Sequence, residues 1–161
     1  MNNDKVNNIS MCPVEANHSE FLFKVFTQSR PDLAFIDAVN EEAKTSILYQ
    51  QFKIEEQQFI EMCPKAEFNI VMLNNQPIGR LYIYYGENTD RILQIGLIEK
   101  YRAMGIGKKI VTMIIEAALR KGKTVSLQVA WFNQRAYNFY EKLGFKVVEN
   151  KGVSYEMHYM S

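Results

Sequence analysis

The sequence has 161 residues, 47% of them hydrophobic and 23% charged, and this composition excludes disordered, fibrous and membrane-spanning classes of protein. Lys and Arg together number 19, and Asp and Glu number 18, so the formal net charge of +1 provides no overall field to attract nucleic acid or an anionic membrane. We therefore expect a soluble, folded protein in which any anion site is local.

One folded unit accounts for the whole length. The chain has no internal repeat, low-complexity tract or proline-rich linker, so we expect a single domain over residues 1–161. The cysteines Cys12 and Cys63 lack the spacing of metal ligands, so we expect buried, reduced thiols and no metal. Residues 1–8 are polar, and no apolar run approaches the ~20 residues that span a bilayer, so we expect a cytoplasmic protein.

The first part of the chain favours a short apolar segment and two helices. Residues 9–14 form the apolar segment, and apolar side chains at helical spacing between Phe21 and Phe26 predict a helix that ends before Pro31. A second helix is predicted to end at Pro64. Its predicted inward stripe consists of Leu48, Phe52, Glu55, Phe59 and Met62. One carboxylate in this stripe departs from an otherwise apolar face.

The middle of the chain changes to a strand-like period. Residues 68–73 and 78–85 predict a hairpin joined by the turn at 74–77. A second turn at 86–89 leads to residues 91–98, which are apolar on both faces as in a central strand. Three antiparallel strands are therefore expected.

Another helical pattern begins near Gly105 and ends at the basic pair and glycine of residues 120–122, which are typical of a helix C-terminus. Its predicted buried face consists of Ile106, Ile110, Met113, Ile114 and Ala117.

The remaining residues predict a strand, a helix and a closing pair of strands. These elements are a strand at 124–129, a helix at 133–143 ending at Gly144, and strands at 145–148 and 153–159. A helix between two strands predicts a right-handed crossover, with parallel pairing of the strands that end near Ile98 and Val129.

The segment of residues 97–108 contains Arg-x-x-Gly-x-Gly between a predicted strand and a predicted helix. Its glycines are explained either by a tight turn alone or by a helix N-terminus whose unpaired N–H groups face a bound anion. Two familiar nucleotide motifs fail here. A dinucleotide fingerprint requires glycine where Ile110 stands, and a P-loop requires Lys-Ser or Lys-Thr where Lys108 and Lys109 stand.

The segment instead resembles the pyrophosphate-binding motif Gln/Arg-x-x-Gly-x-Gly/Ala of the GCN5-related N-acetyltransferase (GNAT) family, through Arg102, Gly105 and Gly107. Residues 133–145 resemble a second motif of that family, Asn-x-x-Ala-x-x-Phe-Tyr-x-x-x-Gly-Phe, in the expected order and at the expected separation. Two departures stand in the first motif. Glu99 replaces the common proline, and the residues 103–104, Ala-Met, replace the frequent Gly-Arg or Gly-Lys pair.

This resemblance implies a layered α/β (α+β) fold. Its mixed central sheet would have about six or seven strands, two of them parallel and splayed, and about four flanking helices. It also implies an N-acetyltransferase that passes an acetyl group from acetyl-CoA, without a metal, to a primary amine by direct attack. The expected partners are a small-molecule or protein amine, with a homodimer as a possible assembly and with no nucleic acid or membrane. A non-catalytic acyl-CoA sensor is the alternative.

The resemblance also assigns residues. Leu97 and Ile98 would pair through their backbone with the pantetheine arm, and Asn133 would hydrogen-bond it. Tyr140 would contact the coenzyme and donate a proton to the departing thiolate, because a phenol with a pKa of about 10 stays protonated at neutral pH; its structural interpretation is aromatic packing. The pyrophosphate would be held by the amides of Arg102, Ala103, Met104, Gly105, Ile106, Gly107 and Lys108.

The base that deprotonates the amine is left open. Family members often carry a carboxylate on the strand at 91–98, where this chain offers Gln94. A lysine-like amine is neutral in only about one molecule in 2,500 at pH 7, whereas an α-amine is neutral in about one in seven. We therefore expect either proton transfer through ordered water or an acceptor of low pKa. The nearby acids, expected to be solvated, are Glu41, Glu42, Glu87 and Asp90. The aromatic residues that line either the acceptor pocket or the core are Tyr82, Tyr84, Tyr85 and Trp131.

Overall fold

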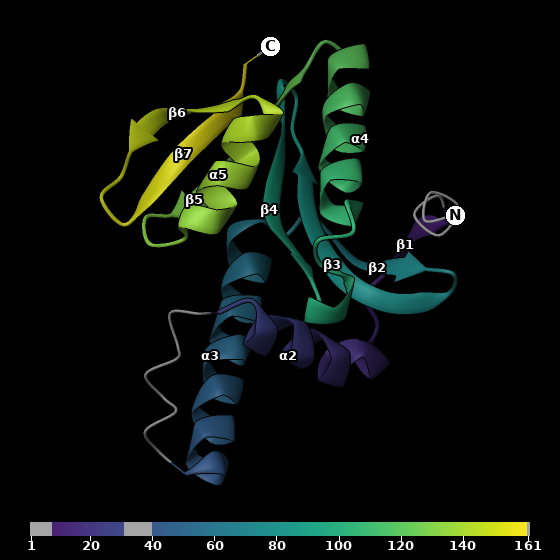
Figure 1. Ribbon diagram of the computed structural model, residues 1–161, viewed down its shortest axis with the longest axis vertical. Helices are drawn as coiled ribbons and strands as arrows, with labels where there is room; N and C mark the ends of the chain where they lie inside the picture. Colours follow the sequence, from purple (N-terminus) through teal and green to yellow (C-terminus); the bar gives the residue numbers. More distant parts are fainter. Residues whose placement is uncertain (1–7, 31–39, 161) are drawn as a thin grey trace.

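The structure is a computed structural model that describes residues 8–30 and 40–160. The polar residues 1–7 and Pro31, which we expected to follow the first helix, lie outside the described residues. Within them the chain forms one seven-stranded sheet of order β1-β2-β3-β4-β5-β7-β6 with four α-helices (Figure 1). The strands are β1 (Ile9–Pro13), β2 (Glu67–Leu73), β3 (Gln76–Tyr85), β4 (Thr89–Leu97), β5 (Thr124–Ala130), β6 (Phe145–Asn150) and β7 (Ser154–Tyr159). The helices are α2 (Ser19–Gln28), α3 (Glu41–Met62), α4 (Ile106–Arg120) and α5 (Gln134–Leu143), with short 3-10 turns η1 (Ala16–His18) and η3 (Glu99–Tyr101).

This arrangement confirms the predicted fold class. Each helix and strand expected from the sequence is present, with boundaries that differ by a few residues, and the apolar segment at 9–14 forms the edge strand β1. None of the described helices is long and apolar enough to cross a membrane. Cys12 and Cys63 are free thiols. We expected both to be buried, but both are half-buried.

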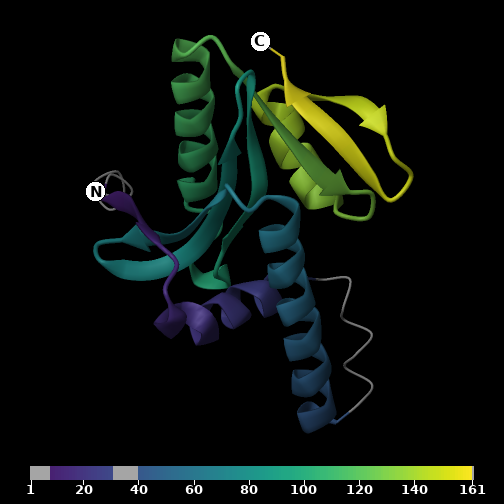
Figure 2. The same ribbon diagram turned by 180° about the vertical axis from the view of Figure 1, so that it is seen from behind.

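The parallel pair β4 and β5 is joined for only part of its length. Their pairing runs from Thr89 with Thr124 to Ile92 with Leu127. Beyond these residues β4 pairs only with β3, and β5 pairs only with β7. Both views show the two strands diverging from this paired end (Figures 1 and 2). We call the region beyond Ile92 and Leu127 the splay, and its backbone groups lack a neighbouring strand.

The two faces of the sheet are covered by different helices. Helices α2 and α3 pack on one face through a cluster around Phe26, Phe52 and Ile70. Helices α4 and α5 pack on the other face through the larger cluster that includes Val111 and Tyr140. Full burial of a large apolar side chain contributes roughly 1.5–3 kcal/mol, so these two clusters fix both layers against the sheet.

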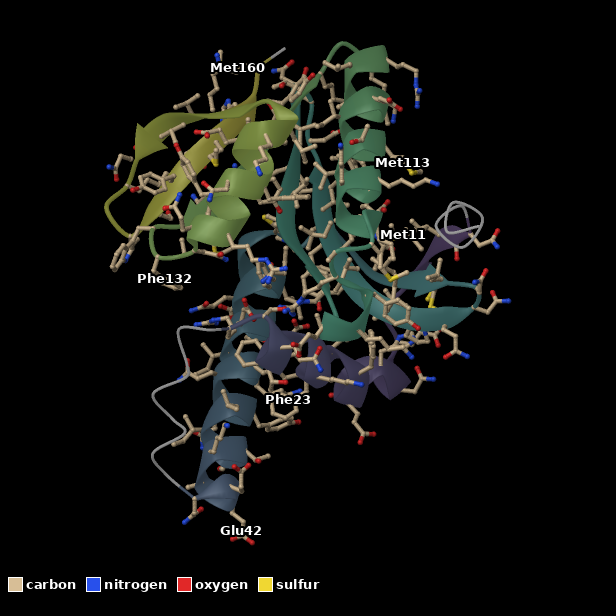
Figure 3. The ribbon with its side chains drawn as sticks, in the orientation of Figure 1. Met11, Phe23, Glu42, Met113, Phe132 and Met160 are labelled. Atoms are coloured by element: carbon tan, nitrogen blue, oxygen red, sulfur yellow. The ribbon has the colours of Figure 1, made fainter. Side chains whose placement is uncertain are left out.

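The buried face of α4 corrects the sequence prediction. The residues buried on α4 are Ile106, Ile110, Val111, Ile115 and Ala118. Met113, which we predicted to be buried, is 52% exposed and points outward in Figure 3. Apolar residues between Ile110 and Ile115 allow two neighbouring stripes on this helix. The stripe that contacts the sheet runs through Val111, Ile115 and Ala118, one residue later than the predicted stripe.

The inward stripe of α3 is confirmed as far as Phe59, whose half-buried ring contacts Tyr82 of β3. Leu48 and Phe52 are buried, and Phe23 of α2 contacts Phe52 between the two helices (Figure 3). Met62, predicted to lie on the same face, is 79% exposed. Glu55 faces polar side chains of the sheet, so the carboxylate in the stripe marks a change from apolar to polar packing.

Candidate functional site

The connection between β4 and α4 is a tight loop with two residues in the left-handed backbone region. Gly105 has φ of 78° and Ala103 has φ of 62°. Glycine adopts this region without steric cost, whereas a residue with a Cβ is strained there by roughly 1–2 kcal/mol. The alanine that departs from the family motif therefore carries strain that the family's usual glycine would avoid.

Gly105 is the N-cap of α4 and supplies no side chain to its first turn. Its carbonyl accepts the N–H of Lys109 at 3.0 Å, which begins the helical ladder. The first N–H groups of α4, at Ile106, Gly107 and Lys108, have no carbonyl partner within the helix. No described atom lies within 4 Å of the position that a Cβ on Gly105 would take. Donors, positive dipole and open space together fit a bound anion.

The guanidinium of Arg102 binds the backbone of the protein itself. Its Nε donates to the carbonyl of Leu97 at 3.1 Å, and Nη2 donates to the carbonyl of Gln28 at 2.5 Å. Burial, with a smaller effect from Arg135, lowers the pKa of Arg102. The arginine of the motif therefore ties the loop to the end of β4 and to α2, and the loop backbone faces the open space.

The end of β4 presents backbone groups to the splay. Leu97 is opposite Gly79 on β3, and the N–H of Ile98 bonds to the carbonyl of Ile78 at 2.9 Å. Leu97 and Gly79 therefore form a non-hydrogen-bonded pair, in which the backbone of Leu97 points away from β3 and toward the splay. The carbonyl of Ile98 accepts from Tyr101 at 2.9 Å, so both backbone groups of Ile98 are paired within the protein.

The second motif folds as its structural interpretation predicted. The Oδ1 of Asn133 accepts the N–H of Ala136 at 3.1 Å and caps α5. The ring of Tyr140 is buried against Phe139 and Phe145. Burial raises the pKa of Tyr140, so its hydroxyl stays protonated over the neutral range. Among the described residues nothing hydrogen-bonds that hydroxyl, which leaves its proton available.

The sequence analysis missed a polar cluster between α3 and the sheet, which we call the α3 polar cluster. It consists of Glu55 and Glu56 of α3, Arg80 and Tyr82 of β3, and Gln94 of β4. Arg80 donates to Glu56 at 2.9 Å and to Glu55 at 3.4 Å, and Gln94 donates to Glu55 at 3.3 Å. Two signals could have found it, namely the carboxylate in the α3 stripe and the alternation that sets Arg80 and Tyr82 on one face of β3.

The acids considered from the sequence have other environments. Asp90, expected at the surface, is 2% exposed and pairs with Lys123 at 2.9 Å. Glu41, Glu42 and Glu87 are exposed as expected. Of the aromatic candidates, Tyr82 is buried, whereas the exposed ones are Tyr84, Tyr85 and Trp131. Within residues 8–30 and 40–160 no group of three or more His, Cys, Asp or Glu side chains is arranged to hold a metal ion.

Comparison with known proteins agrees with this geometry. The family model of the Acetyltransferase (GNAT) family matches residues 22–145. The N-alpha-acetyltransferase 50 of Danio rerio is 31% identical over 71 residues, a match that spans 42% of this chain and 42% of that relative. The PaiA N-acetyltransferase of Thermoplasma acidophilum, solved in complex with coenzyme A, superposes with a TM-score of 0.68 at 21% identity, over 95% of this chain and 99% of that one. A GNAT family acetyltransferase of Elizabethkingia anophelis, solved with acetyl-CoA, superposes with a TM-score of 0.62 at 16% identity, over 96% of this chain and 99% of that one. The chain therefore belongs to the acetyltransferase (GNAT) family, as its two motifs predicted.

Proposed function

We propose that this protein is an N-acetyltransferase that transfers the acetyl group of acetyl-CoA to a primary amine by direct attack. The observation that carries the proposal is the start of α4, where unpaired N–H groups and the open space beside Gly105 adjoin the splay. A diphosphate fits such a site because it needs several backbone donors and close approach. Its family membership and the coenzyme in the two superposed structures support the same choice of acyl donor.

In this proposal the amides of residues 102–108 hold the diphosphate, and Leu97 binds the pantetheine arm and the acyl group. The N–H of Leu97 points into the splay and would hydrogen-bond the thioester oxygen, where negative charge develops during attack. Ile98, whose backbone groups are paired with Ile78 and Tyr101, would contribute by holding this end of β4 in place. The side-chain amide nitrogen of Asn133 would donate to the arm, since its Oδ1 is occupied in capping α5.

Tyr140 is proposed as the acid. As the nitrogen–carbon bond forms and the carbon–sulfur bond breaks, its hydroxyl would pass a proton to the departing thiolate. The raised pKa of the buried phenol keeps this proton in place at neutral pH, so Tyr140 is protonated when the thiolate departs.

We further propose that residues 1–161 form a single domain, because all described strands share one sheet. A cytoplasmic location and a homodimer are also proposed, the location from the composition alone and the homodimer from the family resemblance.

Calorimetry with coenzyme A, followed by a thiol-release assay with acetyl-CoA and a panel of primary amines, tests the function. We expect saturable binding and amine-dependent release of thiol. Binding without release for every amine would instead support an acyl-CoA sensor, and absence of binding would contradict both functions.

A further inference from the structure

The α3 polar cluster borders the splay on the face of the sheet that α3 covers. Gln94 is paired with Tyr82, so both side chains lie on one face of the sheet, and Gln94 lies beyond Ile92, the last residue of β4 paired with β5. Helices α4 and α5 cover the opposite face. The C-terminal half of α3 lies beside the diverging strands in both ribbon views (Figures 1 and 2). A molecule that reaches the splay from the α3 face would therefore meet this cluster.

The cluster carries an unbalanced negative charge. Glu55 and Glu56 share one guanidinium, that of Arg80, which is only 1% exposed. Glu56 is held firmly, since it accepts from Arg80 Nη1 at 2.9 Å and from the Tyr82 hydroxyl at 2.9 Å. Among the residues that the structure describes, Glu55 accepts only from Gln94 Nε2 at 3.3 Å and Arg80 Nη2 at 3.4 Å, which are long contacts. Glu55, with its side chain 18% exposed, therefore keeps acceptor capacity for a further donor.

A second observation indicates that the cluster is incomplete. The Nε of Arg80 is buried and has no hydrogen-bond partner among the described residues. Buried polar groups in native proteins almost always have a partner, and a water molecule or bound ligand is one explanation of an exception. An acceptor atom of a water molecule or of a bound substrate beside Arg80 Nε would complete the cluster.

We propose that Glu55 and Glu56 of α3 form the acceptor subsite for a protonated alkylamine. In this subsite Glu55 removes a proton from the ammonium group, and Gln94 of β4 positions Glu55. The inference rests on the proposed acetyltransferase function and extends it to the acceptor class, an alkylammonium group of lysine-like basicity. β4 carries Gln94 where family members often carry a carboxylate. In this proposal Glu55 of α3, which contacts Gln94, takes the place of that carboxylate.

Two N–H bonds of the ammonium break during the reaction. The first proton goes to a carboxylate oxygen of Glu55 and then to water, and the freed lone pair attacks the acetyl carbon. As the carbon–sulfur bond breaks, the nitrogen loses its second proton to water, the thiolate takes a proton from Tyr140, and water returns a proton to that hydroxyl, so that one proton is released overall. The charged or titratable groups around Glu55 are Glu56 of the same helix and Arg80 and Tyr82 of β3, with Lys53 contributing to the field at Glu56. Burial raises the pKa of Glu56 despite its contact with Arg80.

The test compares Glu55→Gln with the unaltered protein on two amines, n-butylamine as an alkylamine and alanine amide as an α-amine, between pH 7 and 9.5. We expect Glu55→Gln to lower kcat/KM for n-butylamine about 100-fold at pH 7. The loss should shrink as the pH approaches the amine pKa of about 10.4, and it should be much smaller for alanine amide, which is partly neutral at pH 7. Glu55→Asp, which keeps a carboxylate, should recover part of the activity.

Glu61→Gln is the matched control, because it makes the same change at an exposed position of the same helix. Calorimetry with coenzyme A confirms that each variant is folded and keeps its first site. Equal activity of Glu55→Gln and Glu61→Gln, a pH-independent loss, or turnover of alanine amide but not n-butylamine would overturn the inference alone. An unaltered protein that neither binds acetyl-CoA nor releases thiol would instead overturn the proposed function.

Discussion

Gly107 in the first turn of α4 faces Phe139 of α5, and a methyl group added to the glycine would lie 3.8 Å from Cζ of that ring. This distance is an ordinary van der Waals contact, so alanine fits at position 107 within the protein itself. Alanine also favours a helix over glycine by roughly 0.5–1 kcal/mol. Gly107→Ala should therefore stabilise the free protein slightly, as measured by urea unfolding.

A larger side chain at the same position should weaken coenzyme binding. The motif accepts glycine or alanine there, so Gly107→Ala should leave the Kd for coenzyme A nearly unchanged, whereas the branched side chain of Gly107→Val would stand where the diphosphate approaches the backbone. For Gly107→Val we expect this Kd to rise at least about tenfold in calorimetry, a loss of about 1.4 kcal/mol. Thr112→Val, in the middle of α4, introduces the same side chain away from the helix start and should leave the Kd unchanged. Unaltered binding by Gly107→Val would place the coenzyme elsewhere.

Tyr140→Phe should separate turnover from binding. The ring packs against Phe139 and Phe145, and phenylalanine preserves those contacts while removing the hydroxyl. We expect kcat to fall about 100-fold, as for loss of a general acid, and the Kd for coenzyme A to change by less than about twofold. Because burial raises the pKa of Tyr140, the activity of the unaltered protein should show no loss from phenol ionisation at its ordinary pKa near 10.

The control for this variant is Tyr137→Phe, one turn earlier on α5, whose ring contacts Tyr155. Its removal of a hydroxyl should leave kcat nearly unchanged. A full kcat in Tyr140→Phe would restrict Tyr140 to aromatic packing and would leave the thiolate to take its proton from water.

The local sequence determines much of this architecture, and the exceptions have physical reasons. Gly105, Gly122 and Gly144 all take positive φ, so the helix ends could be predicted from residue type alone. The loop and α5 are likewise local, because a cap and a left-handed glycine need only nearby partners. The predicted buried face of α4 was wrong by one residue. A continuous apolar surface permits two stripes, and only contact with the sheet, which is distant in sequence, selects between them.

The acceptor side of the site was less predictable for a similar reason. Glu55 and Gln94 are separated by 39 residues in sequence, and their contact depends on how α3 crosses the sheet. A carboxylate on a helix stripe indicates a polar neighbour without identifying it. Asp90 was misjudged as a surface acid because its partner Lys123 lies on the other side of α4 in the sequence.

An ion pair joins β4 to β7 at the end of the sheet where β4 and β5 are paired. Arg91 of β4 binds Glu156 of β7 across β5, with Nη1–Oε2 and Nη2–Oε1 distances of 2.7 and 2.8 Å, at the end where β4 and β5 are still paired. Ser126 of the intervening strand accepts from the same guanidinium at 3.0 Å. This bidentate contact lowers the pKa of Glu156 from 4.5 to about 2.

Glu156→Gln should lower the free energy of unfolding by about 2 kcal/mol at pH 7, measured in urea, because it removes a charged partner from a largely buried pair. The folded protein binds fewer protons at Glu156 than the unfolded chain does, so the stabilisation is complete above pH 4.5 and is lost as the pH falls toward 2. The difference between the two proteins should therefore drop to less than half by pH 3. Glu149→Gln, at the exposed residue opposite Glu156 on β6, should show little difference at either pH. A deficit of Glu156→Gln that is the same at pH 7 and pH 3 would mean that the carboxylate contributes through packing and not through its charge.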